Sequence, residues 1–345
     1  MTVMADCEGS REAVLEETNS SWSRRAVLAR LAGMGLGGLA WGCGPLVSEA
    51  SHRFGDRVAS ARRGPLRITA TTGLVADLAS RVAGPKVEVI RLMGSGVDPH
   101  LYKASIRDVA RLNRADAIFY NGLHLEGKLG QALRALTGHK WVRAVTERLS
   151  SSQLLKLEGS AANDHMRYDP HVWFDPFAWA QGAFVVADTL SELDPNHAAE
   201  YRERARTTQA EFLDLESECR AILAAVPRNR RVLVTAHDAF GYFGRAFAFE
   251  VKAIQGMSTE TEASIRQVNA LVNFLVARRI PAVFIESTLA NRNVVALVEG
   301  CRARGHRLAI GGELFSDAMG PDGTPEATYP GMMRANARTI AEALA

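Results

Sequence analysis

The stretch Tyr168–Pro176, Tyr-Asp-Pro-His-Val-Trp-Phe-Asp-Pro, lies where the pattern of the chain changes, and it places His171 between two Asp-Pro steps. Proline fixes its own φ and biases the preceding residue toward extended backbone, so we expect both aspartates outside helices. The result is a stiff loop with carboxylates near one imidazole, an arrangement that orients a metal-binding histidine. The tripeptide Asp-Pro-His also occurs at Asp98–His100, and this repetition strengthens the case for a functional site.

Short β-rich runs alternate with helical patterns on both sides of this stretch. Four strands are expected before it: Leu66–Thr72, Val87–Met93, Ala117–Asn121 and Trp141–Val145. Four more are expected later in the chain: Val232–Ala236, Phe249–Gln255, Ala282–Glu286 and His306–Ile310. Strands that alternate with helices predict an α/β fold with parallel sheets.

Helical patterns without a neighbouring strand separate the two sets of strands. We expect helices at Pro176–Leu193 and Asn196–Val226, with Asp194-Pro195 as cap and first-turn proline. A later helix, Glu260–Ala277, is expected to open with a capping box from Thr259 to Glu262. The sequence therefore predicts two α/β lobes joined by one long helix, with the ligand site between the lobes. The boundaries that follow are 1–50 for an export signal and tether, 51–193 for the N-terminal lobe, 194–227 for the linking helix and 228–345 for the C-terminal lobe.

Composition excludes some classes of function. The chain has 345 residues, 47% apolar and 23% charged, and its net charge of +3 is too small and too scattered for a nucleic-acid-binding protein. The four cysteines are too far apart for a local CxxC motif. Cys219 and Cys301 could pair, and two buried thiols are an equally good interpretation.

The N-terminus resembles a bacterial export signal. Arg24-Arg25 precedes a glycine-rich, weakly apolar run of roughly 16 residues, which is too short to span a bilayer and is typical of a Tat-type signal. Cys43 lies in a degraded lipobox, with Gly42 before it and Trp41 where a small residue is preferred. Lipid attachment at Cys43 and soluble release near Ala50 both stay open. Either outcome places the mature protein outside the cytoplasm, as a periplasmic or cell-surface protein.

Four candidate metal ligands fall at or just beyond the carboxyl ends of predicted strands. They are His100, His171, His237 and Asp317, two from each predicted lobe. Open α/β sheets bind ligands at this edge, and lobe interfaces are common binding sites. Three imidazoles and one carboxylate form a closed site for a divalent first-row metal. Capture requires neutral histidines, so affinity should fall below about pH 6.5.

Each candidate also has a simpler interpretation. His100 could be an ordinary loop residue, His237 a buried histidine bonded to backbone, and Asp317 a turn cap before Pro321. Glu286 competes with Asp317, although it is better interpreted, like Glu313, as a supporting or turn-forming group. His124 could assist metal access or be structural. The other histidines are expected on the surface or in the core: His52, His139, His165, His197 and His306.

Several stretches together resemble a known family, the zinc/manganese-binding lipoproteins, which are the cluster A-I solute-binding proteins of metal ABC importers. The match runs from about Leu66 to the C-terminus and is closest to the TroA-type branch. The stretches are Gly96-Val-Asp-Pro-His, Asn121-Gly-Leu-His-Leu-Glu, Asp169-Pro-His-Val-Trp-Phe-Asp-Pro, Thr235-Ala-His-Asp-Ala-Phe-Gly-Tyr-Phe, Phe284-Ile-Glu-Ser and Gly311-Gly-Glu-Leu-Phe-Ser-Asp-Ala-Met-Gly.

The resemblance implies two (β/α)4 lobes joined by a rigid helix, here Asn196–Val226. It also implies Zn²⁺ or Mn²⁺ as transported ligand, bound by His100, His171, His237 and Asp317, and delivery by a monomer to an ABC permease. The manganese-specific branch has Glu at the position of His237, and the zinc-specialised branch has a His-rich loop that is absent here. The function is then not enzymatic. A zinc hydrolase, with Glu286 as base and Asp317 not a ligand, and a surface adhesin are the alternatives.

Overall fold

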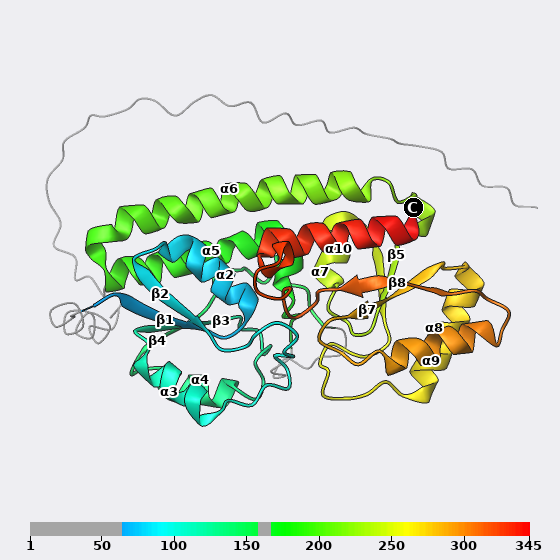
Figure 1. Cartoon of the computed structure of the whole chain (residues 1–345), viewed down its shortest axis with the longest axis horizontal. Helices are drawn as coiled ribbons and strands as arrows, with labels where there is room; N and C mark the ends of the chain where they lie inside the picture. Colours follow the sequence, from blue (N-terminus) through cyan, green and yellow to red (C-terminus); the bar gives the residue numbers. More distant parts are fainter. Residues whose placement is uncertain (1–63, 158–166) are drawn as a thin grey trace, which may run out of the picture. The chain divides into compact units, whose positions relative to one another are not determined.

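Two parallel α/β lobes follow one another along the part of the chain that the computed structural model describes, residues 64–157 and 167–345 (Figure 1). The predicted export signal with Arg24-Arg25, Cys43 and Ala50 lies outside the described residues. Within those two ranges, no helix has the length and apolar character needed to cross a membrane. The predicted α/β fold class with two lobes is confirmed, whereas the exact lobe boundaries stay a prediction.

The first lobe is built on a four-stranded sheet in the order β2-β1-β3-β4, and all its strand pairs are parallel. Parallel neighbours require crossover connections, which helices provide here. The elements are β1 (Leu66–Ala70), α2 (Gly73–Ala83), β2 (Val87–Arg91), α3 (Ile106–Arg114), β3 (Ala117–Tyr120), α4 (Gly130–Leu136) and β4 (Trp141–Ala144). All four strands lie within the ranges predicted from the sequence.

The second lobe has the same chain connections, but its four strands form two two-stranded sheets, β5-β6 and β7-β8. β5 pairs in parallel with β6, β7 pairs in parallel with β8, and β5 contacts β7, so the spatial order is that of the first lobe. The elements are β5 (Val232–Thr235), α7 (Gly241–Phe247), β6 (Glu250–Ala253), α8 (Ile265–Arg278), β7 (Ala282–Glu286), α9 (Arg292–Arg302) and β8 (Ala309–Leu314). The two lobes therefore have equivalent connections, and α8 corresponds to α3.

The long helix α6 (Ala198–Leu223) runs along both lobes beside α5 (Pro176–Leu193) and α10 (Tyr329–Leu344) (Figure 1). Its buried residues recur every three or four positions and form one apolar stripe: Tyr201, Ala205, Thr208, Phe212, Leu215, Cys219 and Leu223. Arg204 Nε donates to Val82 O at 2.7 Å in the first lobe, and Arg334 Nε donates to Glu218 Oε2 at 2.8 Å from α10. The helix is thus fixed to both halves, as a linking element should be.

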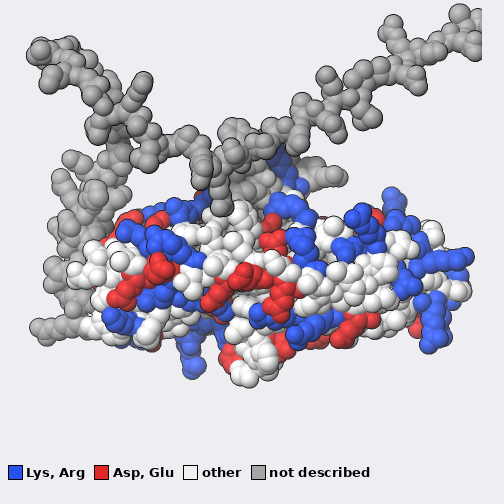
Figure 2. All heavy atoms as spheres, turned by 90° about the horizontal axis from the view of Figure 1, so that it is seen from above, with Lys and Arg blue, Asp and Glu red and all other residues white. Residues whose placement is uncertain are grey.

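The opposite face of α6 is polar, as its Arg/Glu-rich sequence predicts. Arg204, Arg206 and Arg220 each pair with a glutamate three or four residues earlier on the helix. Figure 2 shows basic and acidic side chains interspersed over the face of the molecule that carries α6. Mixed charges of this kind are typical of a solvated surface.

Two sequence predictions are wrong in position. Helix α8 begins at Ile265, after a capping box made by Ser264 and Gln267, and not at Glu260 after Thr259. The hydroxyl of Thr259 caps no helix among the described residues and instead donates to Asp98 Oδ2 at 2.5 Å. The last strand runs over Ala309–Leu314 and not His306–Ile310, because the chain from His306 still closes α9, where His306 N donates to Cys301 O.

The core is continuous between the lobes. The largest cluster of buried apolar residues takes side chains from β1, β3, α2, α5, α6, α7 and α10, and smaller clusters underlie the outer helices of each lobe. Cys219 belongs to the largest cluster and Cys301 to the second, and both are buried free thiols. The interpretation of two buried thiols is therefore correct, and they do not pair.

Candidate metal centre

All four candidate ligands come together between the lobes. His100 follows β2, His171 precedes the 3₁₀ helix Val172–Phe174, His237 lies two residues after β5, and Asp317 lies three residues after β8. Each offers one donor atom, and these atoms lie within 4.8 Å of one another. The side chains are buried, with exposed fractions of 4% for His100, 1% for Asp317 and 0% for the other two.

The distances between donor atoms match those around a small ion. His100 Nε2 lies 3.4 Å from His171 Nε2 and 3.6 Å from Asp317 Oδ2. Asp317 Oδ1 lies 3.4 Å from His171 Nε2, and Asp317 Oδ2 lies 3.4 Å from His237 Nε2. Ligands held at roughly 2.1 Å in a tetrahedron are about 3.4 Å apart. Four donors thus surround a point that suits zinc-like coordination.

Three atoms at this point have no hydrogen-bond partner among the described residues. They are His237 Nε2 and both carboxylate oxygens of Asp317. Buried polar atoms are normally satisfied, so a group of unsatisfied ones that converge on one point needs an explanation. A cation bound at this point would supply it.

Two of the histidines have their rings fixed by a buried carboxylate. Asp169 Oδ1 accepts from the backbone N and lies 2.8 Å from the ring Nδ1 of His171. Glu286 does the same for His237, with Oε1 accepting from the backbone N at 2.9 Å and Oε2 lying 2.5 Å from Nδ1. This contact leaves Nε2 of each ring directed at the shared point. Glu286, the last residue of β7, is therefore a supporting group, which agrees with its interpretation from the sequence.

His100 is held differently. Asp98 Oδ1 accepts from His100 N at 2.8 Å, the same turn as Asp169 makes with His171. The other oxygen of Asp98, however, accepts from Thr259 Oγ1, a residue of the second lobe. The position of His100 thus depends on a contact between the lobes and not on a carboxylate at its ring.

The charges of the cluster are strongly coupled. Burial lowers the pKa of His100 to about 3, and the charges of His171 and His237 act in the same direction. Burial also disfavours charge on His171, but the hydrogen bond and charge of Asp169, followed by Asp317, raise the pKa of His171 to about 9.

His237 and Asp317 shift in opposite directions. Burial opposes charge on His237, yet the charges of Glu286 and Asp317 raise the pKa of His237 well above its usual value. Burial raises the pKa of Asp317, but the charge of His237 and the contact with His171 hold it well below its usual range. The carboxylate is thus neutralised by protons on imidazoles, which a metal cation would replace.

Access to the centre lies at His100. A pocket of about 180 Å³ is lined by His100, His124, Leu125, Gly127, Lys128, Ser258 and Glu260. Lys128 Nζ lies 3.5 Å from Glu260 Oε1 and connects the two lobes across this pocket. His124 is exposed and is not a ligand of the cluster, so the interpretation that it assists access fits its position.

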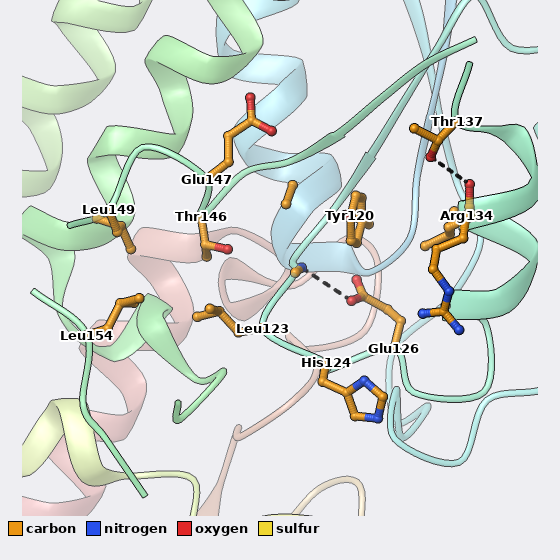
Figure 3. Close-up of a pocket in the computed structure, with 14 residues that line it drawn as sticks. Tyr120, Leu123, His124, Glu126, Arg134, Thr137, Thr146, Glu147, Leu149 and Leu154 are labelled. Atoms are coloured by element: carbon orange, nitrogen blue, oxygen red, sulfur yellow. Dashed lines mark hydrogen bonds between the residues drawn. The ribbon is translucent and has the colours of Figure 1, made fainter. Parts of the chain in front are cut away.

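A second pocket, of about 430 Å³, lies beside the same loop (Figure 3). His124 and Glu126 point in different directions there. Glu126 is fully buried and accepts from Thr71 Oγ1 and Asn121 N, each at 2.7 Å. Burial raises the pKa of Glu126, and these hydrogen bonds oppose the change. The carboxylate therefore orders the loop after β3 that carries His124.

Other residues singled out in the sequence lie elsewhere. Asp175 does not reach an imidazole, since it caps α5 through Ala178 N and pairs with Arg245. Glu313 is an exposed residue inside β8, so its interpretation as a supporting or turn-forming group is wrong. Of the remaining histidines, His139 is exposed, and His197 and His306 are half-buried, away from the cluster. His52 and His165 lie outside the described residues.

Two supporting residues were missed by the sequence analysis. The local pattern around Thr259 predicts a helix cap, and its partner Asp98 is 161 residues away, so no local pattern indicates the contact. Trp173 Nε1 donates to Ser316 O at 3.0 Å and so fixes the residue before Asp317. Trp173 lies in the Tyr168–Pro176 stretch, but its partner could not be read from the sequence.

Comparison with known proteins identifies the family of this fold and site. Residues 68–343 match the family model described as zinc-uptake complex component A, periplasmic. The chain is 46% identical over 300 residues to the zinc-binding protein TroA of Treponema pallidum, a match that covers 87% of this chain and 95% of the relative.

Two further similarities agree. The manganese-binding lipoprotein MntA of Bacillus subtilis is 43% identical over 279 residues, which cover 81% of this chain and 90% of the relative. The solved structure of the periplasmic zinc-binding protein TroA from Treponema pallidum superposes with a TM-score of 0.78 and covers 82% of this chain and all of the solved chain.

Proposed function

The chain belongs to the family of the periplasmic zinc-uptake complex component A, and from this premise we propose that it captures a divalent transition metal outside the cytoplasm and delivers it to an ABC importer. The proposed ligands are His100, His171, His237 and Asp317. The zinc-binding and manganese-binding names of its relatives support this class of cargo.

One observation supports the proposal most directly. Four donor residues from four separate loops place their atoms within 4.8 Å of one another, and four of the distances between these residues are 3.4 to 3.6 Å. Burying a carboxylate and three imidazoles together is costly unless protons or a metal cation balance the charge of the carboxylate. Both oxygens of Asp317 face the centre, so the carboxylate can bind the ion through one oxygen or two.

The donor set favours zinc over manganese. Three neutral nitrogens and one carboxylate follow the usual stability order, in which Mn²⁺ binds more weakly than Zn²⁺. Selection between the two ions in the cell would then depend on their supply and on the importer. The experiment is a competition titration of both ions on one protein, with metal content measured by mass spectrometry after purification from the native compartment.

Capture exchanges protons for the metal. At neutral pH the raised pKa of His171 keeps a proton on the ring, and the incoming cation replaces it at Nε2 while Asp169 keeps its bond at Nδ1. His100 lines the access pocket, so it is the ligand nearest to solvent on the path of the ion. Because α6 is bonded to both lobes, small loop shifts and not a wide hinge motion are expected for release.

The alternatives lack a supporting observation. A hydrolase needs a free general base beside an open metal position, but both oxygens of Glu286 already accept bonds from His237. The relatives are named as a zinc-binding protein, a manganese-binding lipoprotein and a manganese ABC transporter substrate-binding lipoprotein, and none of these names is that of an enzyme. No contact or surface in the described residues favours the adhesin.

Export and anchoring are also part of the proposal. The Arg24-Arg25 segment would direct export of the folded protein, and Cys43 would carry a lipid if the degraded lipobox is processed. Lipoprotein relatives support an extracytoplasmic location. A Cys43→Ala variant that leaves the membrane fraction would identify the anchor, and an unchanged distribution would favour cleavage near Ala50. A monomer in solution is expected.

The test of the function has two parts. Purified His171→Ala should lose high-affinity zinc binding, measured by competition with a chromogenic chelator. Deletion of the gene in its host should reduce uptake of radioactive zinc or manganese at limiting concentrations. Normal uptake of both ions in the deletion strain would refute the transport role.

A further inference from the structure

The residues that open α3 recur in the second lobe. Residues 104–112 read Ala-Ser-Ile-Arg-Asp-Val-Ala-Arg-Leu, and residues 263–271 read Ala-Ser-Ile-Arg-Gln-Val-Asn-Ala-Leu, so six of the nine positions are identical. α3 follows β2 and α8 follows β6, the second strand of each lobe. The two copies therefore occupy equivalent places in the repeated fold.

Folding explains only part of this repeat. Ser105 and Ser264 each form a capping box, with Asp108 and Gln267 as their partners. Leu112 and Leu271 are buried. The isoleucines between these positions are neither part of the cap nor part of the core.

Ile106 and Ile265 are the two most exposed large apolar side chains among the described residues, at 91% and 82%. A single exposed apolar residue needs no explanation. Two matched isoleucines at the first position of equivalent helices do need one, because neither side chain is buried and so neither contributes hydrophobic free energy to folding. They indicate a surface that is covered in a complex.

The charge next to each isoleucine is also unpaired. Arg107 and Arg266 are exposed, and in the part of the chain that the structure describes neither forms an ion pair. This differs from α6, where Arg204, Arg206 and Arg220 each have a glutamate partner. Each lobe thus presents an apolar side chain beside a free guanidinium, which suits an apolar pocket bordered by carboxylates.

The location of the two Ile-Arg pairs relates them to the metal centre. Helix N-termini in a parallel α/β lobe lie at the carboxyl edge of the sheet, where the ligand loops also lie. Ser105 is five residues after His100, and Ser264 is five residues after Thr259, whose hydroxyl binds Asp98. The access pocket is lined by His100 from one of these connections and by Ser258 and Glu260 from the other.

We propose that Ile106-Arg107 and Ile265-Arg266 are two equivalent contact points through which the protein docks on the membrane subunits of its importer. The inference rests on the proposed function. A partner that receives both points must present the same kind of acceptor twice, as a pair of equivalent transmembrane subunits does. Docking there directs the access pocket toward the membrane, which is where the released ion must go.

The first test is uptake of radioactive zinc in a host strain that lacks the chromosomal gene and carries a variant copy. Ile106→Ser/Ile265→Ser should reduce uptake by about tenfold or more, as expected for the loss of two interface anchors. Each single variant should give an intermediate loss, and Arg107→Glu/Arg266→Glu should also reduce uptake. The zinc affinity of the purified variants should stay within about twofold of the parent, because the substituted side chains are remote from the ion.

The matched control is Leu213→Ser/Ile310→Ser. Both residues are exposed apolar side chains, one on α6 and one near the start of β8, the amino edge of the sheet. This pair should leave uptake unchanged. Normal uptake by the Ile106→Ser/Ile265→Ser protein at wild-type abundance would overturn the docking proposal, as would an equal loss in the control.

A second test separates docking from transport. With p-benzoyl-phenylalanine in place of Ile106 or Ile265, irradiation of living cells should link both positions to the same transmembrane protein. Crosslinks to lipid alone, or to no membrane protein, would overturn the proposal whatever the uptake result. By contrast, a deletion strain with normal metal uptake would refute the proposed function itself.

Discussion

The two Asp-Pro-His turns of this protein are alike in sequence and different in what they do. In both, the aspartate Oδ1 accepts from the backbone N of the histidine at 2.8 Å. In the second turn the same oxygen also lies 2.8 Å from His171 Nδ1, so the ring is fixed. In the first turn, the remaining oxygen of Asp98 is bound by Thr259 from the other lobe.

Under the proposed function, this difference would give the two proposed ligands, His171 and His100, different parts in capture and release. His171 is fully buried, and its carboxylate partner lies in its own lobe. His100 borders the access pocket and is positioned by a bond that exists only while the two lobes and their loops keep their present arrangement. The second turn therefore supplies one proposed ligand whose support lies in its own lobe, and the first supplies one whose position depends on contact between the lobes.

The largest effect is expected from the loss of Asp317, whose carboxylate lies beside the histidines of both turns, His100 and His171. Asp317→Ala removes the anion that faces all three imidazoles, a loss comparable to breaking a buried charge pair, about 3–5 kcal/mol. Zinc affinity should fall by roughly 10²- to 10⁴-fold, measured by chelator competition. Asp322→Ala, which removes an exposed carboxylate paired with Arg91, is the control and should bind zinc normally. Equal affinities for the two variants would remove Asp317 from the site.

A smaller effect is expected from Asp169→Asn, which tests the second turn, Asp169–His171, where the carboxylate fixes the histidine ring. The amide cannot support the ring of His171 as a carboxylate does, and loss of such a partner typically reduces metal affinity by about 10–100-fold. The matched variant is Asp175→Asn in the same stretch, where asparagine can still cap α5. The Asp175→Asn variant should bind zinc with nearly the affinity of the parent protein. If Asp169→Asn binds zinc as tightly as Asp175→Asn, the contact between Asp169 and the ring of His171 has no role in zinc binding.

Zinc affinity should depend on pH over a wider range than unperturbed histidines would give. The pKa of His171 is raised to about 9, so below that pH the ring carries a proton that the metal must displace. Affinity should therefore rise from pH 6.5 toward pH 9, by at most about tenfold per pH unit for each proton released. Titration calorimetry in buffers of different ionisation enthalpy counts these protons. Flat affinity between pH 7 and 9 would contradict a protonated empty site.

The smallest effect is expected from Thr259→Val, which tests the first turn, Asp98–His100. The substitution removes one hydrogen bond, about 1 kcal/mol, so zinc should dissociate roughly fivefold faster while His171 and its partner are untouched. Stopped-flow transfer of zinc to a chelator measures the rate. Thr261→Val, an exposed threonine two residues away, should dissociate zinc at the parent rate. Identical rates for all three proteins would mean that the contact between Asp98 and Thr259 does not hold His100.

The sequence predicted the elements and the four converging residues well because each has a local signal. Alternating short strands and helices required parallel sheets, and a histidine or aspartate just after a strand lies at the edge of the sheet where ligands bind. The repeated Asp-Pro-His marked two related turns, and the apolar stripe of α6 marked a helix packed on one face.

The sequence could not predict contacts between residues far apart in the chain. A threonine followed three residues later by glutamate looks like a capping box, yet Thr259 binds Asp98 in the other lobe, and Glu262 pairs with Arg292. The same limit applies to Trp173 and Ser316. Local pattern identifies which side chains can bind or cap, whereas only the tertiary fold decides which of several partners each one meets.

The central claim is that two ligands from each half of the chain hold one ion between the lobes. The most direct measurement is diffraction from zinc-loaded crystals at the zinc absorption edge. The account predicts one anomalous peak, with Nε2 of His100, His171 and His237 at roughly 2.0–2.1 Å from it and the carboxylate of Asp317 completing the shell. A peak elsewhere, or an ion held by only one lobe, would contradict it.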